Sequence, residues 1–297
     1  MADFEKEFAE LLNDGISDVV EEGNDNVFDE DLSDETFKGG IENTFLQTPM
    51  GKAEDIIAQG VKTDVDLVVC IDVTESMKPI IDTVKGMTLS LYDDVVAELA
   101  KKKRKVRDFR VKVVAFRDYY CDGEYAMAES QFFKLPDETS GFSEFVLGLN
   151  ADGGGDVPEN ALEAIALAMK SDWVHAVSTN ERARNIIVVF TDADAHPLEK
   201  AQDGVTKYYP KDMLTSLSDL KDAWEGQKKL AATSVADLYR MDPAAKRLII
   251  YSPQDSYPWN EMSTLKGVKM VSIEPAKGGK ELDRETLLND IGGSIRN

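Results

Sequence analysis

Apolar and polar positions divide the chain into two parts with different periodicities. Over residues 4–20, phenylalanines and aliphatic residues recur at helical spacing, and this stripe predicts an amphipathic helix. Residues 21–40 are acidic and almost without aliphatic pattern, which indicates a mobile linker. From Asp64 onward, short apolar runs alternate with helical patterns, as is typical of a parallel α/β sheet. We therefore expect an acidic N-terminal segment over residues 1–60 and one α/β domain over residues 61–297.

The predicted domain alternates strands with helices along its whole length. The apolar run from Ile186 to Phe190 is continuous, as in a strand that is buried on both faces of a sheet. Pro158 is expected in the first turn of a helix, where its missing N–H costs nothing. Strands are predicted over 65–71, 109–116, 130–135 (a short edge strand), 186–190, 247–251 and 268–273, and helices over 78–100, 141–148, 157–170, 212–224, 259–265 and 284–295.

The charge of the chain is strongly negative and unevenly placed. The formal net charge is −22, and residues 1–60 supply −14 of it, with 17 Asp and Glu against 3 Lys and Arg. This balance argues against nucleic acid or an anionic membrane as the main partner. No apolar run approaches about 18 residues, so no membrane span is expected. The first residues lack the basic and apolar regions of a signal peptide, and Cys70 and Cys121 read as reduced thiols, so we expect a cytoplasmic protein.

Three oxygen-bearing side chains follow the first predicted strand of the domain. Asp72 ends the apolar run, and the hydroxyl residues Thr74 and Ser76 come two and four positions later. We expect one tight loop in which the three side chains are aimed at a common point. Hard oxygen ligands suit Mg²⁺, Mn²⁺ or Ca²⁺ rather than Zn²⁺ or copper. Because two hydroxyls leave the cation largely un-neutralised, it still attracts a carboxylate from elsewhere, and this favours binding over hydrolysis.

Two later loops carry further oxygen ligands. One opens a predicted helix and holds Asp156 and Glu159, and the other holds Asp192 directly after the predicted strand 186–190. In an open parallel sheet the loops at the carboxyl ends of the strands share one edge, and binding sites form where the strand order switches. The three loops are therefore expected to meet. The glycines 153–155 are expected to let the backbone approach closely at positive φ, and they are not a phosphate loop, because no Gly-Lys-Ser/Thr follows.

These motifs resemble, in order and context, those of von Willebrand factor A-type domains with a metal-ion-dependent adhesion site. The phrases are Asp-Val-Thr-Glu-Ser-Met from Asp72, Gly-Gly-Gly-Asp-Val-Pro-Glu from Gly153 and Thr-Asp-Ala-Asp-Ala-His from Thr191. They look most like a bacterial and protist branch of that family. The resemblance covers about residues 62–275. It implies a Rossmann-like α/β fold, a doubly wound and mostly parallel sheet with one antiparallel edge strand.

The resemblance also implies roles for the candidate residues. Thr74 and Ser76 would bind Mg²⁺ (or Mn²⁺ or Ca²⁺) directly, and Asp72 and Asp192 would hold it mostly through water. The sixth position would be left for a Glu or Asp of a protein partner. Some relatives accompany kinases, phosphatases or stress-resistance operons, so a partner of that kind is implied.

The chain departs from the family pattern at two positions. Thr74 replaces the usual serine, which keeps the hydroxyl and stiffens the side chain. Asp156 stands where many members have threonine, and Glu159 competes with it for the metal. Either acid neutralises the ion further and weakens its attraction for an incoming carboxylate. For Asp118, Asp194 and His196 a role beside the site and an ordinary turn or hydrogen-bonding role both stay open.

Three functional interpretations remain at this point. The first is a metal-dependent protein-interaction module that is not an enzyme. The second is a scaffold protein in which the metal only fastens the three loops. The third is a Mg²⁺-dependent phosphohydrolase with Asp72 as nucleophile, although Thr74 cannot supply the second carboxylate that this chemistry commonly uses as acid or base. A carboxylate among residues 21–35 is also a candidate to occupy the metal, in the same molecule or in a neighbouring one, because tethering raises its effective concentration.

Overall fold

The computed structural model describes most of the predicted domain. The predicted helix over 4–20, the acidic segment around it and Asp156 lie outside the described residues, so the predictions made for them stay predictions. The described residues are 62–101, 106–155, 157–177, 181–198, 207–226, 241–253, 256–274, 282 and 284–296.

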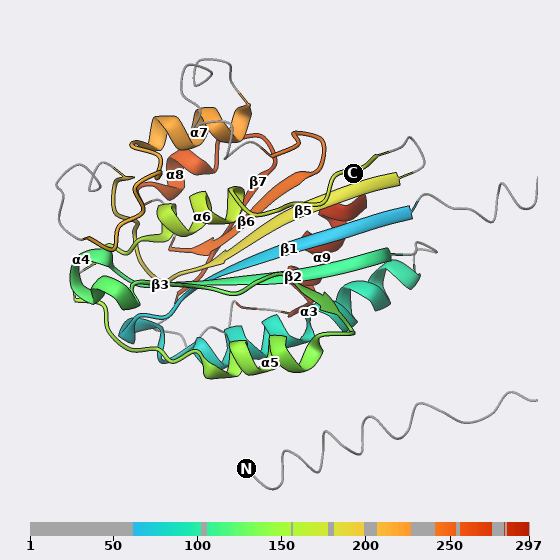
Figure 1. Ribbon diagram of the computed structural model, residues 1–297, viewed down its shortest axis with the longest axis horizontal. Helices are drawn as coiled ribbons and strands as arrows, with labels where there is room; N and C mark the ends of the chain where they lie inside the picture. The colour runs from blue at the N-terminus through green and yellow to red at the C-terminus, as the bar shows by residue number, and fades with distance from the viewer. Residues whose placement is uncertain are drawn as a thin grey trace, which may run out of the picture. The chain divides into compact units, whose positions relative to one another are not determined.

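A twisted sheet with five parallel strands forms the centre of the structure (Figure 1). In space the parallel strands follow one another in the order β2, β1, β5, β6, β7. The chain therefore winds outward in both directions from β1, as predicted for a doubly wound fold. The strands are β1 (Lys62–Asp72), β2 (Val106–Phe116), β5 (Glu181–Phe190), β6 (Lys246–Ser252) and β7 (Val268–Ser272).

The antiparallel edge of the sheet consists of two short pieces. β3 (Met127–Glu129) and β4 (Phe133–Leu135) both pair with β2 in the antiparallel direction. The sequence predicted one edge strand over 130–135. The pairing with β2 is interrupted between β3 and β4, at Ser130. The side chain of Ser130 accepts a hydrogen bond from the amide of Val113 (2.9 Å) and donates one to the carbonyl of Gln131 (2.7 Å).

Helices cover both faces of the sheet. α3 (Ile81–Lys101), α5 (Thr139–Gly148) and α9 (Arg284–Arg296) pack on one face. The other face carries α6 (Ala161–Met169), α7 (Leu217–Glu225) and α8 (Trp259–Met262). None of the described helices is long and apolar enough to cross a membrane.

The central strands feed both hydrophobic layers. In β1, Leu67 and Val69 enter the layer beneath α3, whereas Val68 and Cys70 enter the layer beneath α6, and all four are fully buried. Neighbouring residues of a strand point to opposite faces, so a strand covered on both sides needs apolar residues at every position. This is why the apolar run of β5 is continuous in the sequence.

The helix that follows the glycine loop begins later than predicted. It starts at Ala161, so Pro158 precedes the helix and the prediction that it sits in the first turn is wrong. The amide of Glu159 donates to the carbonyl of Asp194 (2.9 Å) and the amide of Asn160 donates to the carbonyl of Arg117 (3.1 Å). These bonds to other loops hold the chain in an extended conformation up to the helix, and this long-range pairing cannot be read from local pattern.

A buried ion pair fixes the register of β1 and β2. Asp66 is 1% exposed and accepts hydrogen bonds from Arg110 Nε (2.8 Å) and Nη2 (2.6 Å), as well as from the amide of Val174 (2.6 Å). The guanidinium also lies over the ring of Phe132, 4.6 Å from its centroid. A planar guanidinium that bonds both carboxylate oxygens is geometrically specific, so this pair joins two strands and the loop after α6.

We expect Asp66→Ala to reduce the free energy of unfolding by on the order of 3 kcal/mol, because it leaves Arg110 and the amide of Val174 without their buried acceptor. Urea denaturation measures the change. The control is Lys78→Ala, which removes an exposed pair with Glu75 and should change stability by less than about 0.5 kcal/mol. Equal effects of the two substitutions would contradict the role given to Asp66.

Candidate metal centre

The candidate ligands lie at the carboxyl ends of two neighbouring central strands. Asp72 is the last residue of β1, and Thr191 and Asp192 directly follow β5. The two strands are paired up to Ile71 and Phe190, which places the two loops side by side. The glycine loop that precedes α6 reaches the same place. The three loops predicted to meet are therefore brought together, although the first and the third lie over a hundred residues apart in the sequence.

Asp72 is buried and bonded through both carboxylate oxygens. Its Oδ1 accepts hydrogen bonds from the amide (3.0 Å) and the hydroxyl (2.7 Å) of Thr74, and its Oδ2 accepts one from the hydroxyl of Thr191 (2.7 Å). Burial raises the pKa of Asp72 to about 6, although these hydrogen bonds oppose the shift. The carboxylate thus fixes the first loop and the third loop against each other.

The two hydroxyls of the first loop continue this hydrogen-bonded row. Thr74 Oγ1 lies 3.0 Å from Ser76 Oγ, and Ser76 donates to Asp192 Oδ1 at 2.9 Å. A short 3₁₀ turn over Glu75–Met77 aims Ser76 at the third loop, and the fully buried side chain of Met77 anchors that turn. Asp72, Thr74, Ser76 and Asp192 therefore form one continuous cluster, as the spacing in the sequence predicted.

The glycine loop lies directly against the first loop. The amide of Asp152 donates to the carbonyl of Val73 (2.9 Å), and the amide of Glu75 donates to the carbonyl of Gly153 (3.1 Å). Gly153 and Gly154 have φ values of 71° and 73°, as predicted for these glycines. A Cβ atom at Gly154 would lie 3.1 Å from Thr74 Cβ and 3.2 Å from Glu159 Oε1. The absence of a side chain at this position is therefore what lets Thr74 and Glu159 approach each other.

Of the two candidate acids of the second loop, Glu159 is the one that the structure describes. It is 3% exposed, and its backbone bonds the third loop on both sides, to Asp194 (2.9 Å) and to the amide of His196 (2.8 Å). Asp156, the other candidate, lies outside the described residues. The structure thus places Glu159 beside Thr74, and the choice between the two acids stays open.

Thr191 and Asp122 belong to this region but were given no role from the sequence. Thr191 is fully buried and bonds Asp72, and its only sequence signal is a hydroxyl immediately before Asp192. Asp122 accepts hydrogen bonds from the amide of Gly154 at 3.2 and 3.0 Å, through Oδ1 and Oδ2. No spacing rule connects Asp122 with a loop about thirty residues away, so only the folded chain reveals this contact.

Asp118 and His196 form a buried pair behind the cluster. Asp118 Oδ2 lies 3.5 Å from His196 Nε2, and both side chains are almost fully buried. Burial alone would raise the pKa of Asp118, but hydrogen bonds from His196, the amide of Tyr120 and the thiol of Cys121 outweigh it and hold the pKa well below its usual range. The pair supports the loops from behind, which favours the structural interpretation of both residues. Among the described contacts, Asp194 meets the cluster through its backbone, since its carbonyl accepts a hydrogen bond from the amide of Glu159 (2.9 Å).

The hydrogen-bonded row has more contacts than hydroxyl protons. Each hydroxyl carries one proton, and the two protons of Thr74 and Ser76 face three contacts: Thr74 with Asp72, Thr74 with Ser76, and Ser76 with Asp192. When the carboxylates are ionised and each hydroxyl donates to its carboxylate, the lone pairs of two oxygens 3.0 Å apart face each other. A cation that accepts both lone pairs removes this conflict, so the donor set fits a hard divalent ion.

This donor set differs from the commonest protein metal sites. Among the described residues there is no cluster of three or more His, Cys, Asp or Glu side chains arranged to hold a metal. Zinc sites and most calcium loops depend on such clusters. Here hydroxyl oxygens would take the places nearest the ion, with fewer carboxylates around them.

Comparison with known proteins identifies the class of domain. A family model described as von Willebrand factor A domain matches residues 66–213, and this span holds all of the candidate ligands. The chain therefore contains a von Willebrand factor A-type domain, as its motifs and its doubly wound sheet indicated. Domains of this family are commonly protein-interaction modules and are generally not enzymes. No curated protein matches the chain in sequence.

Solved structures with similar folds are distant in sequence. One is a von Willebrand factor type A protein from Catenulispora acidiphila, with 14% identity, a TM-score of 0.38, and coverage of 77% of this chain and 43% of that chain. Another is the pilus adhesin SpaC from Lactobacillus rhamnosus GG in its open conformation, with 12% identity, a TM-score of 0.42, and coverage of 78% and 30% respectively. This chain thus spans less than half the length of either protein.

Glu163, four residues after Glu159, makes the stability of the protein depend on pH. It is fully buried in α6 and accepts a hydrogen bond from the hydroxyl of Tyr209 at 2.8 Å. Burial raises its pKa to about 7, which hydrogen bonds from Tyr209 and Asn160 only partly oppose. A carboxyl whose pKa is higher in the folded chain than in the unfolded one holds its proton more tightly when folded. It therefore destabilises the protein as the pH rises from 4.5 through 7.

We expect Glu163→Gln to stabilise the protein above pH 7, by on the order of 2 kcal/mol, and to have little effect near pH 4.5. The amide keeps an oxygen for Tyr209 and removes only the charge. Thermal denaturation of both proteins at a series of pH values measures the difference. A stability difference that does not change with pH would contradict the raised pKa.

Proposed function

We propose that this protein is a metal-dependent interaction module that takes Mg²⁺ or Mn²⁺ at Asp72, Thr74, Ser76 and Asp192 and binds an acidic side chain of a protein partner there. The observation that carries the proposal is the excess of contacts over protons in the row from Asp72 to Asp192. When both hydroxyls donate their protons in hydrogen bonds to carboxylates, their oxygens face each other with lone pairs. Such oxygens are poor hydrogen-bond partners for each other and good ligands for a hard cation.

The residues of the three loops would have different roles in holding such an ion. Thr74 and Ser76 supply neutral oxygens. Asp72 and Asp192 supply negative charge and orient the hydroxyls by accepting hydrogen bonds from them. Glu159, or Asp156, adds a further carboxylate from the second loop. The ion itself would supply a Lewis-acidic position that accepts a carboxylate. A third acid near it weakens that attraction, so we expect a modest affinity for the partner's carboxylate.

Exposed apolar side chains gather in the loops at the same edge of the sheet. Among the described residues, seven large apolar side chains are exposed, and five of them lie in these loops or beside them. Tyr120 and Tyr125 follow β2, Val157 belongs to the glycine loop, Tyr257 follows β6, and Tyr208 lies against Gly123. Tyrosine is enriched at protein interfaces because it combines apolar area with a hydrogen-bonding hydroxyl. This distribution favours a protein over a small molecule as the partner.

The burial of Asp72 argues against a phosphohydrolase. A nucleophilic carboxylate needs a free oxygen that can reach the substrate phosphorus. Asp72 is 0% exposed, and each of its oxygens accepts a hydrogen bond from a threonine. We therefore favour the interaction module over the hydrolase with Asp72 as nucleophile.

We expect saturable binding of Mg²⁺ and Mn²⁺ by isothermal titration calorimetry, and at least about a tenfold loss of affinity in Thr74→Val. Valine keeps the shape of the side chain and removes only the hydroxyl oxygen. Asp72→Ala should abolish binding.

The matched control is Thr88→Val in α3. Thr88 is also fully buried, but its hydroxyl donates to the carbonyl of Val84 within α3 (2.7 Å) and not to the cluster. This variant should bind metal as the wild type does. Absence of saturable binding in the wild type, or equal losses in the two Thr→Val variants, would overturn the metal site.

We expect the bound cation to retain a position that a carboxylate can take. Water-proton relaxation of the Mn²⁺-loaded protein reports the exchange of water on the ion. Titration with acetate or with a glutamate-containing peptide should lower the relaxation enhancement, because the carboxylate replaces bound water. The same peptide with glutamine in place of glutamate is the control and should have no effect.

The other interpretations give different results in this experiment. If the metal only fastens the three loops, EDTA lowers the melting temperature but carboxylates leave the relaxation unchanged. If the site hydrolyses phosphate esters, the Mg²⁺-loaded protein turns them over and Asp72→Asn does not. Either result would replace the interaction module with the corresponding alternative.

A further inference from the structure

Two pockets lie at the end of the sheet opposite the metal centre. Both are at the amino ends of strands, one at the start of β2 and the other at the starts of β6 and β7. The first has a volume of about 400 Å³ and the second of about 670 Å³. Both volumes fall within the range that small-molecule sites occupy, but the charges that line the two pockets are arranged differently.

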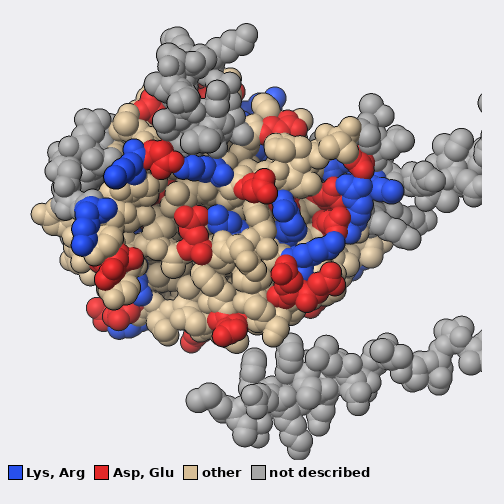
Figure 2. All heavy atoms as spheres, viewed as in Figure 1, with Lys and Arg blue, Asp and Glu red and all other residues tan. Residues whose placement is uncertain are grey.

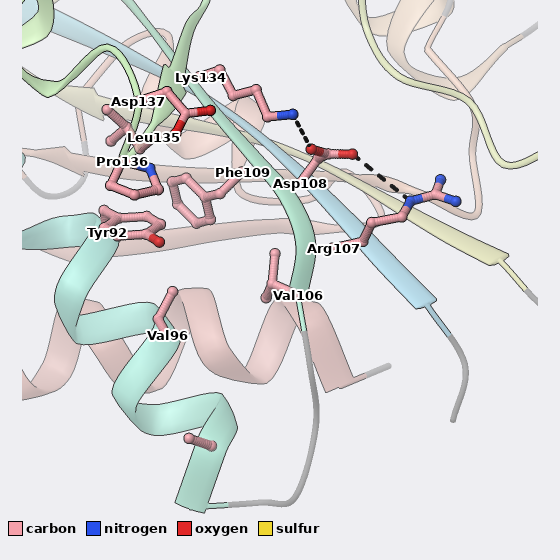
Figure 3. Close-up of a pocket in the computed structure, with 11 residues that line it drawn as sticks. Tyr92, Val96, Val106, Arg107, Asp108, Phe109, Lys134, Leu135, Pro136 and Asp137 are labelled. Atoms are coloured by element: carbon pink, nitrogen blue, oxygen red, sulfur yellow. Dashed lines mark ion pairs between the residues drawn. The ribbon is translucent and has the colours of Figure 1, made fainter. Parts of the chain in front are cut away.

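The cations of the β2 pocket are neutralised within the protein (Figure 3). Lys134 forms an ion pair with Asp108 (2.6 Å), and Arg107 forms ion pairs with Asp108, Asp64 and Glu181. On the face seen in Figure 2, Lys and Arg side chains likewise lie next to Asp and Glu. A pocket whose cations already have carboxylate partners has little attraction for an anionic ligand.

The cations of the β6–β7 pocket have no such partners. Lys246, Arg247 and Lys266 line it, and none of them forms an ion pair with a carboxylate of the described residues. Lys246 is the first residue of β6 and is 5% exposed, and its Nζ has no hydrogen-bond partner within the part of the chain that the structure describes. Glu225, the acid that lines this pocket, lies close enough to influence Lys246 but forms no ion pair with it.

The surroundings hold the ammonium of Lys246 in place. Its Nζ lies 4.8 Å from the ring centroid of Trp224, and the indole of Trp224 donates to the carbonyl of Lys266 (2.9 Å). Burial lowers the pKa of Lys246, and Glu225 and Asp242 only partly oppose this shift. A cation that is buried without an acceptor costs free energy, and an anion bound beside it would recover part of that cost.

Asn185, which is next to Lys246 in the sheet, is a second buried polar side chain without a hydrogen-bond partner among the described residues. It is paired with Lys246 in the β5–β6 register and is fully buried, and neither Nδ2 nor Oδ1 has a partner. By the alternation of the strands, both residues point to the face that carries α6, α7 and α8. Asn185 does not line the pocket but lies directly beside Lys246 in the sheet. Buried polar groups are nearly always bonded, so the unmatched Lys246 points to a ligand at the pocket that it lines.

We infer that the pocket at the starts of β6 and β7 is a binding site for a small phosphorylated ligand, held by Lys246 with Arg247 and Lys266. Three cations suit a phosphate better than a carboxylate, because a phosphate presents more oxygens and more negative charge. The volume of about 670 Å³ leaves room for a group attached to the phosphate. The site is separate from the metal centre and does not depend on it.

The test is calorimetric titration of the full chain in EDTA at constant ionic strength, with inorganic pyrophosphate and AMP as probes and citrate as the carboxylate comparison. We expect saturable binding of at least one phosphate probe, weaker binding of citrate, and at least a tenfold loss of affinity in Lys246→Met. The matched control is Lys134→Met, which removes the same charge from the β2 pocket and should leave the affinity unchanged.

Lys266→Met provides a second variant in case Lys246→Met does not fold, since Lys266 is exposed and should be replaced without loss of structure. It should weaken phosphate binding by a smaller factor, about threefold. Absence of saturable binding of either phosphate probe would overturn the inference. So would citrate binding as tightly as the phosphates, or equal losses in the variants of the two pockets. Because EDTA is present throughout, these results are independent of the outcome for the metal centre.

Discussion

The hydrogen bonds to the carboxylate of Asp72 are the interaction on which the functional end of this protein depends. A carboxylate at the end of a fully buried strand must be satisfied by its neighbours, because water does not reach it. Thr74 satisfies one oxygen and Thr191 the other, at 2.7 Å each. The ends of β1 and β5 are already neighbours in the sheet, and because the two threonines belong to different loops, the single buried carboxylate holds the first and third loops together there.

The number of hydroxyl protons in the cluster explains why it suits a cation. The hydroxyls of Thr74 and Ser76 serve two carboxylates and also approach each other, which leaves one contact without a proton. Burial raises the pKa of Asp72 to about 6, and protonation of this carboxyl would supply the missing proton. A hard cation relieves the conflict between the two hydroxyl oxygens without protonation. The loops therefore form a place for positive charge inside a strongly acidic chain.

We propose a different kind of recognition at each end of the sheet. The carboxyl ends hold the oxygen-rich cluster and the exposed tyrosines, which together suit a protein partner that brings an acidic side chain. The amino ends of β6 and β7 hold cations without carboxylate partners around a pocket. The sheet between them is packed on both faces, so each end is held rigidly.

The sequence by itself determined the sheet, the helices on its two faces and the clustering of the candidate ligands Asp72, Thr74, Ser76 and Asp192. These follow from local pattern: apolar runs covered on both faces, and oxygen side chains immediately after strands. Tertiary structure decided what depends on contacts between distant segments. The helix after the glycine loop starts at Ala161 because Glu159 bonds Asp194, and Thr191 and Asp122 join the site through partners in other loops. The lack of a carboxylate partner for Lys246 among the described residues was likewise invisible in the sequence, since it depends on where the acids of other segments lie in the fold.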